Sequence, residues 1–188
     1  MCRSSSPLPC FAGLDDIMKA DPAIVGKEAA YDWSALDNAL KESADRNVHV
    51  VWRVITQYPG RPMQLPQFII DAGAKIHYDK NSPYFGDPIL LEACHQFIYD
   101  MAERYDGDER VAYIQAGLIG YWGEWHTLFD PLIPEEAKDK LSVWFGEAFK
   151  LTPIQIRYPH PAAYTAGMGL HDDSFAFTTV DGEPNGGT

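Results

Sequence analysis

The sequence has few cysteines and few basic residues, and it has no long apolar run. Its cysteines are Cys2, Cys10 and Cys94; they form no CxxC pair and no zinc pattern, and an odd count argues against a disulfide framework. No stretch approaches roughly 18 consecutive apolar residues, so we expect no membrane span. With 27 acidic against 15 basic residues and a net charge of −12, the chain lacks the basic face that nucleic acids and anionic membranes require.

The short motifs of nucleotide binding, nucleophilic catalysis and metal binding are also missing. No GxGxxG, Walker loop or GxSxG occurs, and Cys94 lies on the apolar stripe of an expected helix. The group His171-Asp172-Asp173 matches no specific metal motif, and a turn or a helix cap explains it better. We therefore expect no bound metal and no cofactor.

Aromatic residues, in contrast, are plentiful: they make up 13% of the 188 residues and include five Trp. A chain of this length that is 46% hydrophobic can build one sizeable domain with a real core. Flat aromatic rings stack on the apolar faces of sugar rings, but Trp and Tyr also fill large cores. Composition alone leaves both explanations open and favours core packing.

The apolar pattern predicts helices that alternate with buried strands. Helical spacing of apolar residues is found over 32–46, 89–105 and 134–150. Apolar and β-branched runs predict strands over 48–55, 111–120, 154–158 and 174–180, with a short strand over 74–78. This alternation predicts a parallel sheet that is either doubly wound or closed as a barrel.

Polar and aromatic side chains follow the expected strands, where the active sites of parallel α/β folds lie. They include Gln57 and Tyr58 after the first long strand, residues 122–126 after the second, and His160 after the third. Residues 57–87 form a long stretch rich in Pro and Gly, and loops of that length inside a compact domain are usually functional. Its aromatic side chains could line a sugar subsite or only pin the loop: Tyr58, His77, Tyr78 and Tyr84.

Glu124, in the segment GYWGEWH (Gly120–His126), is the strongest candidate for chemistry. Trp122 and Trp125 flank it, and a carboxyl group walled by indoles should be desolvated and have a raised pKa. A raised pKa is what a general acid needs to protonate a leaving glycosidic oxygen near neutral pH. The alternative, of equal weight, is a structural carboxylate paired with an arginine under a Trp-rich lid.

Other polar residues at the strand ends could assist Glu124. His126 could bind a sugar hydroxyl or tune Glu124, or it could simply bond the backbone. Arg53 sits inside an apolar strand and needs a partner, for which Glu124 is one candidate. Arg157 has a similar place, and either arginine could be purely structural. Our candidate substrate-binding residues are Arg53, Tyr58, Trp122, Trp125, His126, Arg157, His171 and Asp172.

Several segments together resemble known families. YDWSALD (Tyr31–Asp37) resembles the segment that follows the first strand in β-galactosidase-like barrels. RYDGDER (Arg104–Arg110), AYIQAGLIGYWGEWHT (Ala112–Thr127) and GLHDDSF (Gly169–Phe175) resemble an uncharacterised bacterial family, the domain of unknown function 4832. The similarity spans most of residues 31–177, and WGEWH is its most specific part.

The resemblance implies an α/β fold of the incomplete (β/α)8 TIM-barrel kind, corresponding to the N-terminal portion of a glycoside-hydrolase-like barrel. Residues 1–13 would be an irregular N-terminus, 14–180 the partial barrel, and 181–188 a loop at a truncated C-terminus. A complete eightfold barrel takes roughly 250 residues, so the remainder of the barrel would be missing and the chain alone inactive. With 74–78 as the third strand, 111–120 would be the fourth, after which the retaining glycosidase clan places its acid/base glutamate.

By this resemblance the chain is expected to bind a carbohydrate and to hydrolyse glycosidic bonds, with Glu124 as general acid/base. One departure is Gly123, because the clan usually has an Asn there that helps hold the sugar. It favours the alternative, a non-catalytic carbohydrate-binding or structural barrel domain of a larger surface protein. The resemblance also favours an extracellular location, although no signal peptide is visible.

Overall fold

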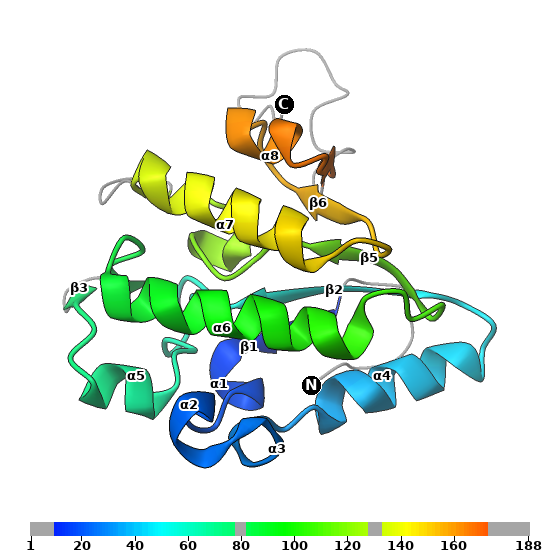
Figure 1. Cartoon of the computed structure of the whole chain (residues 1–188), viewed down its shortest axis with the longest axis horizontal. Coiled ribbons are helices and arrows are strands. Elements are labelled where there is room, and N and C mark those ends of the chain that lie inside the picture. The colour runs from blue at the N-terminus through cyan, green and yellow to red at the C-terminus, as the bar shows by residue number, and fades with distance from the viewer. Residues whose placement is uncertain (1–9, 78–81, 128–132, 173–188) are drawn as a thin grey trace.

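The computed structural model describes residues 10–77, 82–127 and 133–172. Its main feature is a parallel sheet of five strands in the order β1-β2-β5-β6-β7 (Figure 1). The strands are β1 (Cys10–Gly13), β2 (Val50–Ile55), β5 (Val111–Gln115), β6 (Ile154–Ile156) and β7 (Gly169–Leu170). Each strand therefore pairs with the strand that follows it in this sheet.

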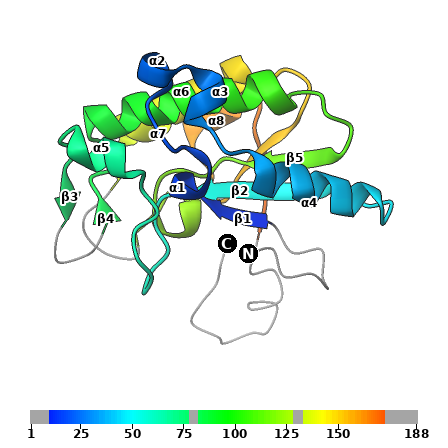
Figure 2. The same ribbon diagram turned by 90° about the horizontal axis from the view of Figure 1, so that it is seen from below.

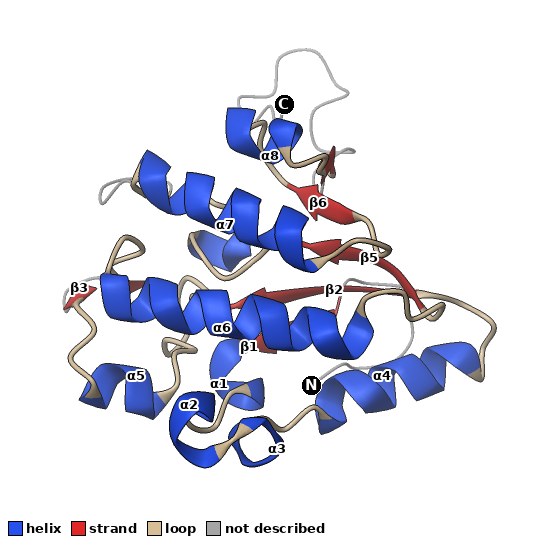
Figure 3. Cartoon of the chain, in the orientation of Figure 1, coloured by secondary structure: helices blue, strands red, loops and turns tan. Residues whose placement is uncertain are grey.

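Longer helices connect these strands and follow the same order from one side of the molecule to the other (Figure 1). The main connections are α4 (Ser34–Ala44), α6 (Pro88–Tyr105), α7 (Glu135–Ala148) and the short α8 (Pro161–Thr165). Figures 2 and 3 show α6 and α7 together across one face of the sheet. Parallel crossovers of one hand, all running in one direction, place their helices on one face in this way.

The remaining helices are short. They are α1 (Leu14–Ile17), α2 (Pro22–Val25) and α3 (Lys27–Ala30) before α4, and α5 (Gln67–Asp71) between β2 and α6. Within the described ranges, none of the helices is both long and apolar enough to cross a membrane.

The core lies between the sheet and α6. Pro88 stands in the first turn of α6, and the Asp87 side chain caps it by accepting from the backbone N–H groups of Ile89 and Leu90. The helix then buries one apolar stripe that includes Phe97, as its helical spacing predicts. The buried Trp52 of β2 meets the edge of Tyr105 at the end of α6, with 4.9 Å between ring centroids.

The opposite face of the sheet carries a row of four aligned side chains, three of them polar, which we call the polar row. The strand register aligns Phe11, Arg53, Gln115 and Gln155 on neighbouring strands, so their side chains share one face. A parallel sheet with helices on one face and polar side chains on the other is barrel-like. Among the described strands the order never reverses, whereas a doubly wound sheet requires a reversal.

The expected α/β fold with a parallel sheet is confirmed. Helices 32–46, 89–105 and 134–150 match α4, α6 and α7 within two residues at each end, and strands 48–55 and 154–158 match β2 and β6 within two. The strand expected over 174–180 lies outside the described residues. The expectation for 1–13 was wrong in part, because Cys10–Gly13 forms β1 and joins the sheet beside β2.

Two other strand expectations were wrong in part. A short strand does lie within 74–78, as β3 (Ile76–His77), but it pairs antiparallel with β4 (Ser82–Pro83) in a separate two-stranded sheet. As a result β5, which precedes Glu124, is the third described strand of the main sheet and not the fourth. β5 also ends at Gln115 rather than at 120.

Candidate functional site

The segment from Gly117 to His126 leaves β5 and folds back over the carboxyl end of β2. Leu118, Trp122 and Trp125 have φ angles of 71°, 56° and 61°, in the left-handed region that most residues avoid. Short hydrogen bonds hold this backbone: the Leu118 N–H donates to the Val54 carbonyl at 2.7 Å, and Trp122 N–H donates to the Gln57 carbonyl at 3.0 Å. Left-handed residues grouped in this way are frequent at functional sites.

Two glycines make this fold possible. A Cβ at Gly117 would lie 2.1 Å from the Val54 carbonyl oxygen. Gly123 has a φ of 68°, and a Cβ there would lie 2.9 Å from Ile55 Cγ2. A side chain at position 123 would therefore press against Ile55 of β2 and would also adopt a left-handed φ, so glycine is the residue that fits without strain.

Arg53 is the centre of the site. Its side chain is fully buried, although it lies on the polar face of the sheet. Its Nε donates to Gln115 Oε1 at 3.0 Å, and its NH1 donates to the Trp122 carbonyl and to Glu124 Oε1, both at 3.1 Å. A guanidinium group that is removed from water needs protein acceptors for its N–H groups, and these three oxygens are such acceptors.

The Glu124 carboxyl group joins Arg53 to His126. Oε1 faces Arg53, and Oε2 lies 3.0 Å from His126 Nε2. The Glu124 side chain is 15% exposed, so the carboxyl group can still be reached from solvent. The polar partners of this carboxyl group are thus a cation and an imidazole, and the expected wall of two indoles stays a prediction. The pairing of Arg53 with Glu124, the carboxylate named as its candidate partner, is confirmed.

The end of β7 adds two further polar residues to the same edge. His171 lies within 3.3 Å of Arg53 NH2 through its Nε2, and because a guanidinium only donates, the ring nitrogen accepts there. Asp172 pairs with Arg157 at 3.0 Å. Within the described part of the chain, no group of three or more His, Cys, Asp or Glu side chains could hold a metal ion.

The expected aromatic residues divide into two groups. Tyr58 and Trp122 are half-buried at the carboxyl edge and meet edge to face, with 6.2 Å between ring centroids. Trp125 instead belongs to the core: it is buried, and its indole N–H donates to the Gly117 carbonyl at 3.0 Å. The indole ring thus faces the core, and a contact between Trp125 and a sugar stays a prediction.

Other candidates lie away from the edge. His77 stacks on Tyr84 beside the small β3–β4 sheet, which agrees with a role in pinning the loop, and Tyr78 is outside the described residues. Cys94 is buried in α6, and this burial raises the pKa of its thiol to about 12. A thiol with such a pKa is inert at neutral pH.

Two residues of the site were missed from the sequence. Gln115 accepts a hydrogen bond from Arg53 Nε. The sequence feature that could have identified it is a polar residue inside an apolar strand. Tyr158 follows β6 and meets His126 edge to face, with 5.2 Å between ring centroids. The sequence feature that could have identified Tyr158 is an aromatic residue close to the end of a buried strand.

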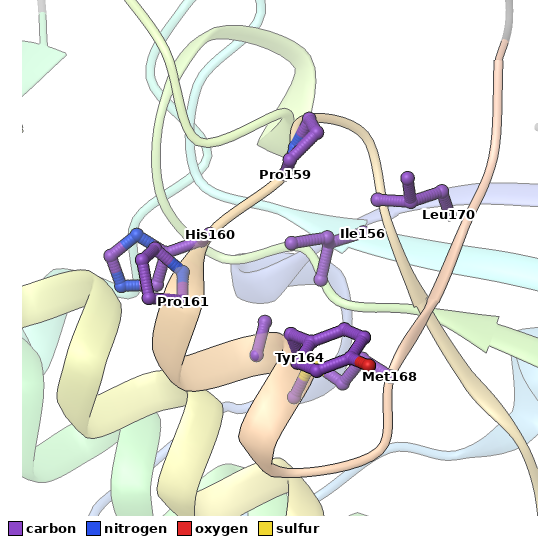
Figure 4. Close-up of a pocket in the computed structure, with 8 residues that line it drawn as sticks. Ile156, Pro159, His160, Pro161, Tyr164, Met168 and Leu170 are labelled. Atoms are coloured by element: carbon purple, nitrogen blue, oxygen red, sulfur yellow. The ribbon is translucent and has the colours of Figure 1, made fainter.

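An apolar cavity of about 340 Å³ lies near the site but does not include it. Figure 4 shows it between β6, α8 and β7, with His160 and Leu170 on opposite sides of Ile156. None of its lining residues contributes a carboxyl group, so the chemistry of the edge is separate from this cavity.

Comparison with known proteins leaves the family open. No protein-family model matches the chain, and no curated protein matches it, so the resemblance to the domain of unknown function 4832 has no independent support. Among solved structures, a β-galactosidase from the psychrophilic Marinomonas ef1 aligns over 79% of this chain and 32% of its own, at 13% identity and a TM-score of 0.46. The chain thus spans about a third of that enzyme. A likeness this weak does not establish a shared barrel or a shared activity.

Proposed function

We propose that the chain is a carbohydrate-active protein of the glycoside-hydrolase-like kind, with its sugar site at the carboxyl edge of β2, β5 and β6. The observation that carries this proposal is the Glu124 carboxyl group. It is partly exposed at that edge and held on both oxygens, and the His126 ring that binds it lies 5.9 Å, centroid to centroid, from Trp122. Carboxyl groups that deliver and accept protons in glycoside hydrolysis need such fixed positions.

In this proposal Glu124 protonates the glycosidic oxygen as the leaving group departs, and then takes a proton from the attacking water. Arg53 and His126 fix the orientation of the carboxyl group, so that no conformational search precedes proton transfer. Cleavage also requires a second carboxylate, which bonds to the anomeric carbon as the glycosidic bond breaks and is then displaced by the water oxygen. Asp172 is our candidate, because it follows β7 at the same edge and Arg157 holds it at 3.0 Å.

The barrel is likewise a proposal. Five parallel strands in chain order, with helices on one face, correspond to the first part of a (β/α)8 barrel. Closure of such a barrel would require further strands beside β1 and β7.

Non-catalytic carbohydrate binding is the second candidate function, and a specific observation favours it. Gly123 stands where the glycosidase clan usually has an Asn beside its acid/base glutamate, so the chain offers no amide there to hold the sugar. A site without that side chain could retain a sugar without cleaving it.

The test is hydrolysis of a panel of aryl glycosides and polysaccharides by the protein that carries this chain, at its native length, and by two variants of it. Glu124→Gln removes the proposed acid, and Glu136→Gln, on an exposed turn of α7, is the matched control. Turnover that falls by roughly 10²-fold or more in Glu124→Gln alone supports the enzyme. Sugar binding that persists in Glu124→Gln, with no turnover by any variant, supports the binding protein. Absence of both binding and turnover would reject the carbohydrate proposal.

A further inference from the structure

Four rings follow one another along the carboxyl edge, and we call them the aromatic arc: Tyr58, Trp122, His126 and Tyr158. The ring centroids of Tyr58 and Trp122 are 6.2 Å apart, those of Trp122 and His126 5.9 Å, and those of His126 and Tyr158 5.2 Å. Each spacing is close to the size of one pyranose ring. Followed from ring to ring, the arc comprises three such spacings.

The arc is distributed over three neighbouring connections of the sheet. Tyr58 follows β2, Trp122 and His126 follow β5, and Tyr158 follows β6. Because β2, β5 and β6 are adjacent and parallel, these connections emerge side by side at one edge. The order of the rings thus follows the order of the strands.

A guanidinium group holds the ring at each end of the arc. Arg61 lies over Tyr58 with its Cζ 4.3 Å from the ring centroid, and Arg157 lies over Tyr158 at 4.8 Å. Cation–π contacts of this kind orient a ring and cover one of its two faces. Tyr158 remains 38% exposed, so part of its surface is available to a ligand.

The acidic group lies in the middle of the arc. Glu124 contacts His126, and Arg53 binds both Glu124 and the Trp122 carbonyl. A single sugar that reached Glu124 would leave at least one end tyrosine without a contact, because the arc extends to both sides of the carboxyl group.

We propose that the site binds an extended oligosaccharide of at least three units, with Glu124 beneath an internal unit and with Tyr58 and Tyr158 as the flanking subsites. This inference rests on the proposed carbohydrate function and adds the length of the ligand. The ligand would then be an internal stretch of a polysaccharide rather than a free monosaccharide.

The experiment measures binding by calorimetry along length series of one to six sugar units. The probes are the β-1,4-linked oligomers of glucose, mannose, xylose and galactose, tested with the unmodified chain. Tyr58→Ala and Tyr158→Ala remove the end rings one at a time, and Tyr158→Phe keeps the ring without its hydroxyl group. Tyr164→Ala is the matched control, because Tyr164 is 86% exposed on α8 and lies outside the arc.

In at least one series we expect the affinity to rise from one unit to about three or four and then to level off. Each loss of an end ring should weaken binding of the long oligomers by about 3- to 10-fold, the range of one aromatic contact. Tyr158→Phe keeps the ring, so it should lose less affinity than Tyr158→Ala. The control Tyr164→Ala and the monosaccharide affinity should stay unchanged.

Two results would overturn this inference in different ways. Equal affinity for all lengths, with no effect of Tyr58→Ala or Tyr158→Ala, would reject the extended site while sugar binding itself stands. No binding of any probe would reject the carbohydrate function and the extended site together.

Discussion

Arg53 shows, at the scale of a single residue, why a buried charge organises its surroundings. We expect Arg53→Met to lower the free energy of unfolding by about 3–5 kcal/mol, because Glu124, Gln115 and the Trp122 carbonyl would lose their shared donor. Urea denaturation followed by circular dichroism measures this change. Arg110→Met is the control: its guanidinium is 47% exposed and pairs with Asp108 on the surface, so its loss should cost less than about 1 kcal/mol. Equal costs for the two variants would contradict the central place of Arg53.

At the same scale, the sequence predicted which residues are unusual better than it predicted their partners. An arginine within an apolar strand had to find an acceptor, and Glu124 was identified as one candidate. The inward turn of Trp125 could not be predicted, because it depends on a left-handed φ of 61° at a residue type that rarely adopts it. Gln115 and Tyr158 were missed because their roles arise only when neighbouring strands align.

Asp106 joins two elements, the end of α6 and the entry to β6. Its carboxylate accepts the backbone N–H groups of Lys150, Leu151 and Thr152 at 2.8–2.9 Å. Burial pushes its pKa upward, but these hydrogen bonds outweigh burial and leave the pKa of Asp106 below the ordinary 3.8. A carboxyl group with a lowered pKa stabilises the fold above its unfolded pKa, and this contribution is lost as the pH falls through the lower, folded value.

We therefore expect Asp106→Asn to lower the free energy of unfolding at pH 7 by about 1.5–3 kcal/mol, the range for hydrogen bonds to a charged group. The difference from the unmodified chain should shrink as the pH falls from 3.8 toward the lower pKa of the folded state, because Asp106 of the unfolded chain takes up its proton first. Urea unfolding at pH 7, 5 and 3 measures it. Asp45→Asn, on the surface at the end of α4, controls for the loss of one charge. A difference that is the same at all three pH values would show that the charge of Asp106 contributes nothing.

Helices with a clear periodicity of apolar residues were predicted well. Strands that form only by pairing with distant segments were not. The apolar stripe and the Asp87-Pro88 start define α6 locally, so its limits follow from the sequence. β1 is only four residues long and becomes a strand by pairing with β2, while β3 pairs with β4 outside the main sheet. Such pairing depends on contacts between distant segments, and no local pattern contains it.

For the molecule as a whole, alternation of helices and strands predicted a parallel sheet but left the order of its strands open. The order became visible only in the structure, in which each strand of the sheet lies beside its predecessor. Two features follow from that order. The polar row from Phe11 to Gln155 occupies the face opposite the helices, and the loops that carry Glu124 and His171 meet at one edge.

The net charge of −12 acts on the whole molecule and gives a prediction at that scale. Repulsion among 27 acidic groups opposes the compact state, and salt screens it. Raising NaCl from 20 to 200 mM should therefore stabilise the chain by about 1 kcal/mol, seen as a rise in Tm of about 3 °C. The double variant Glu92→Gln/Glu109→Gln changes two exposed carboxylates and reduces the net charge from −12 to −10, so its Tm should respond less to salt. If salt instead lowered the Tm, attractive ion pairs such as Lys27–Asp100 and Arg104–Asp37 would outweigh the overall repulsion.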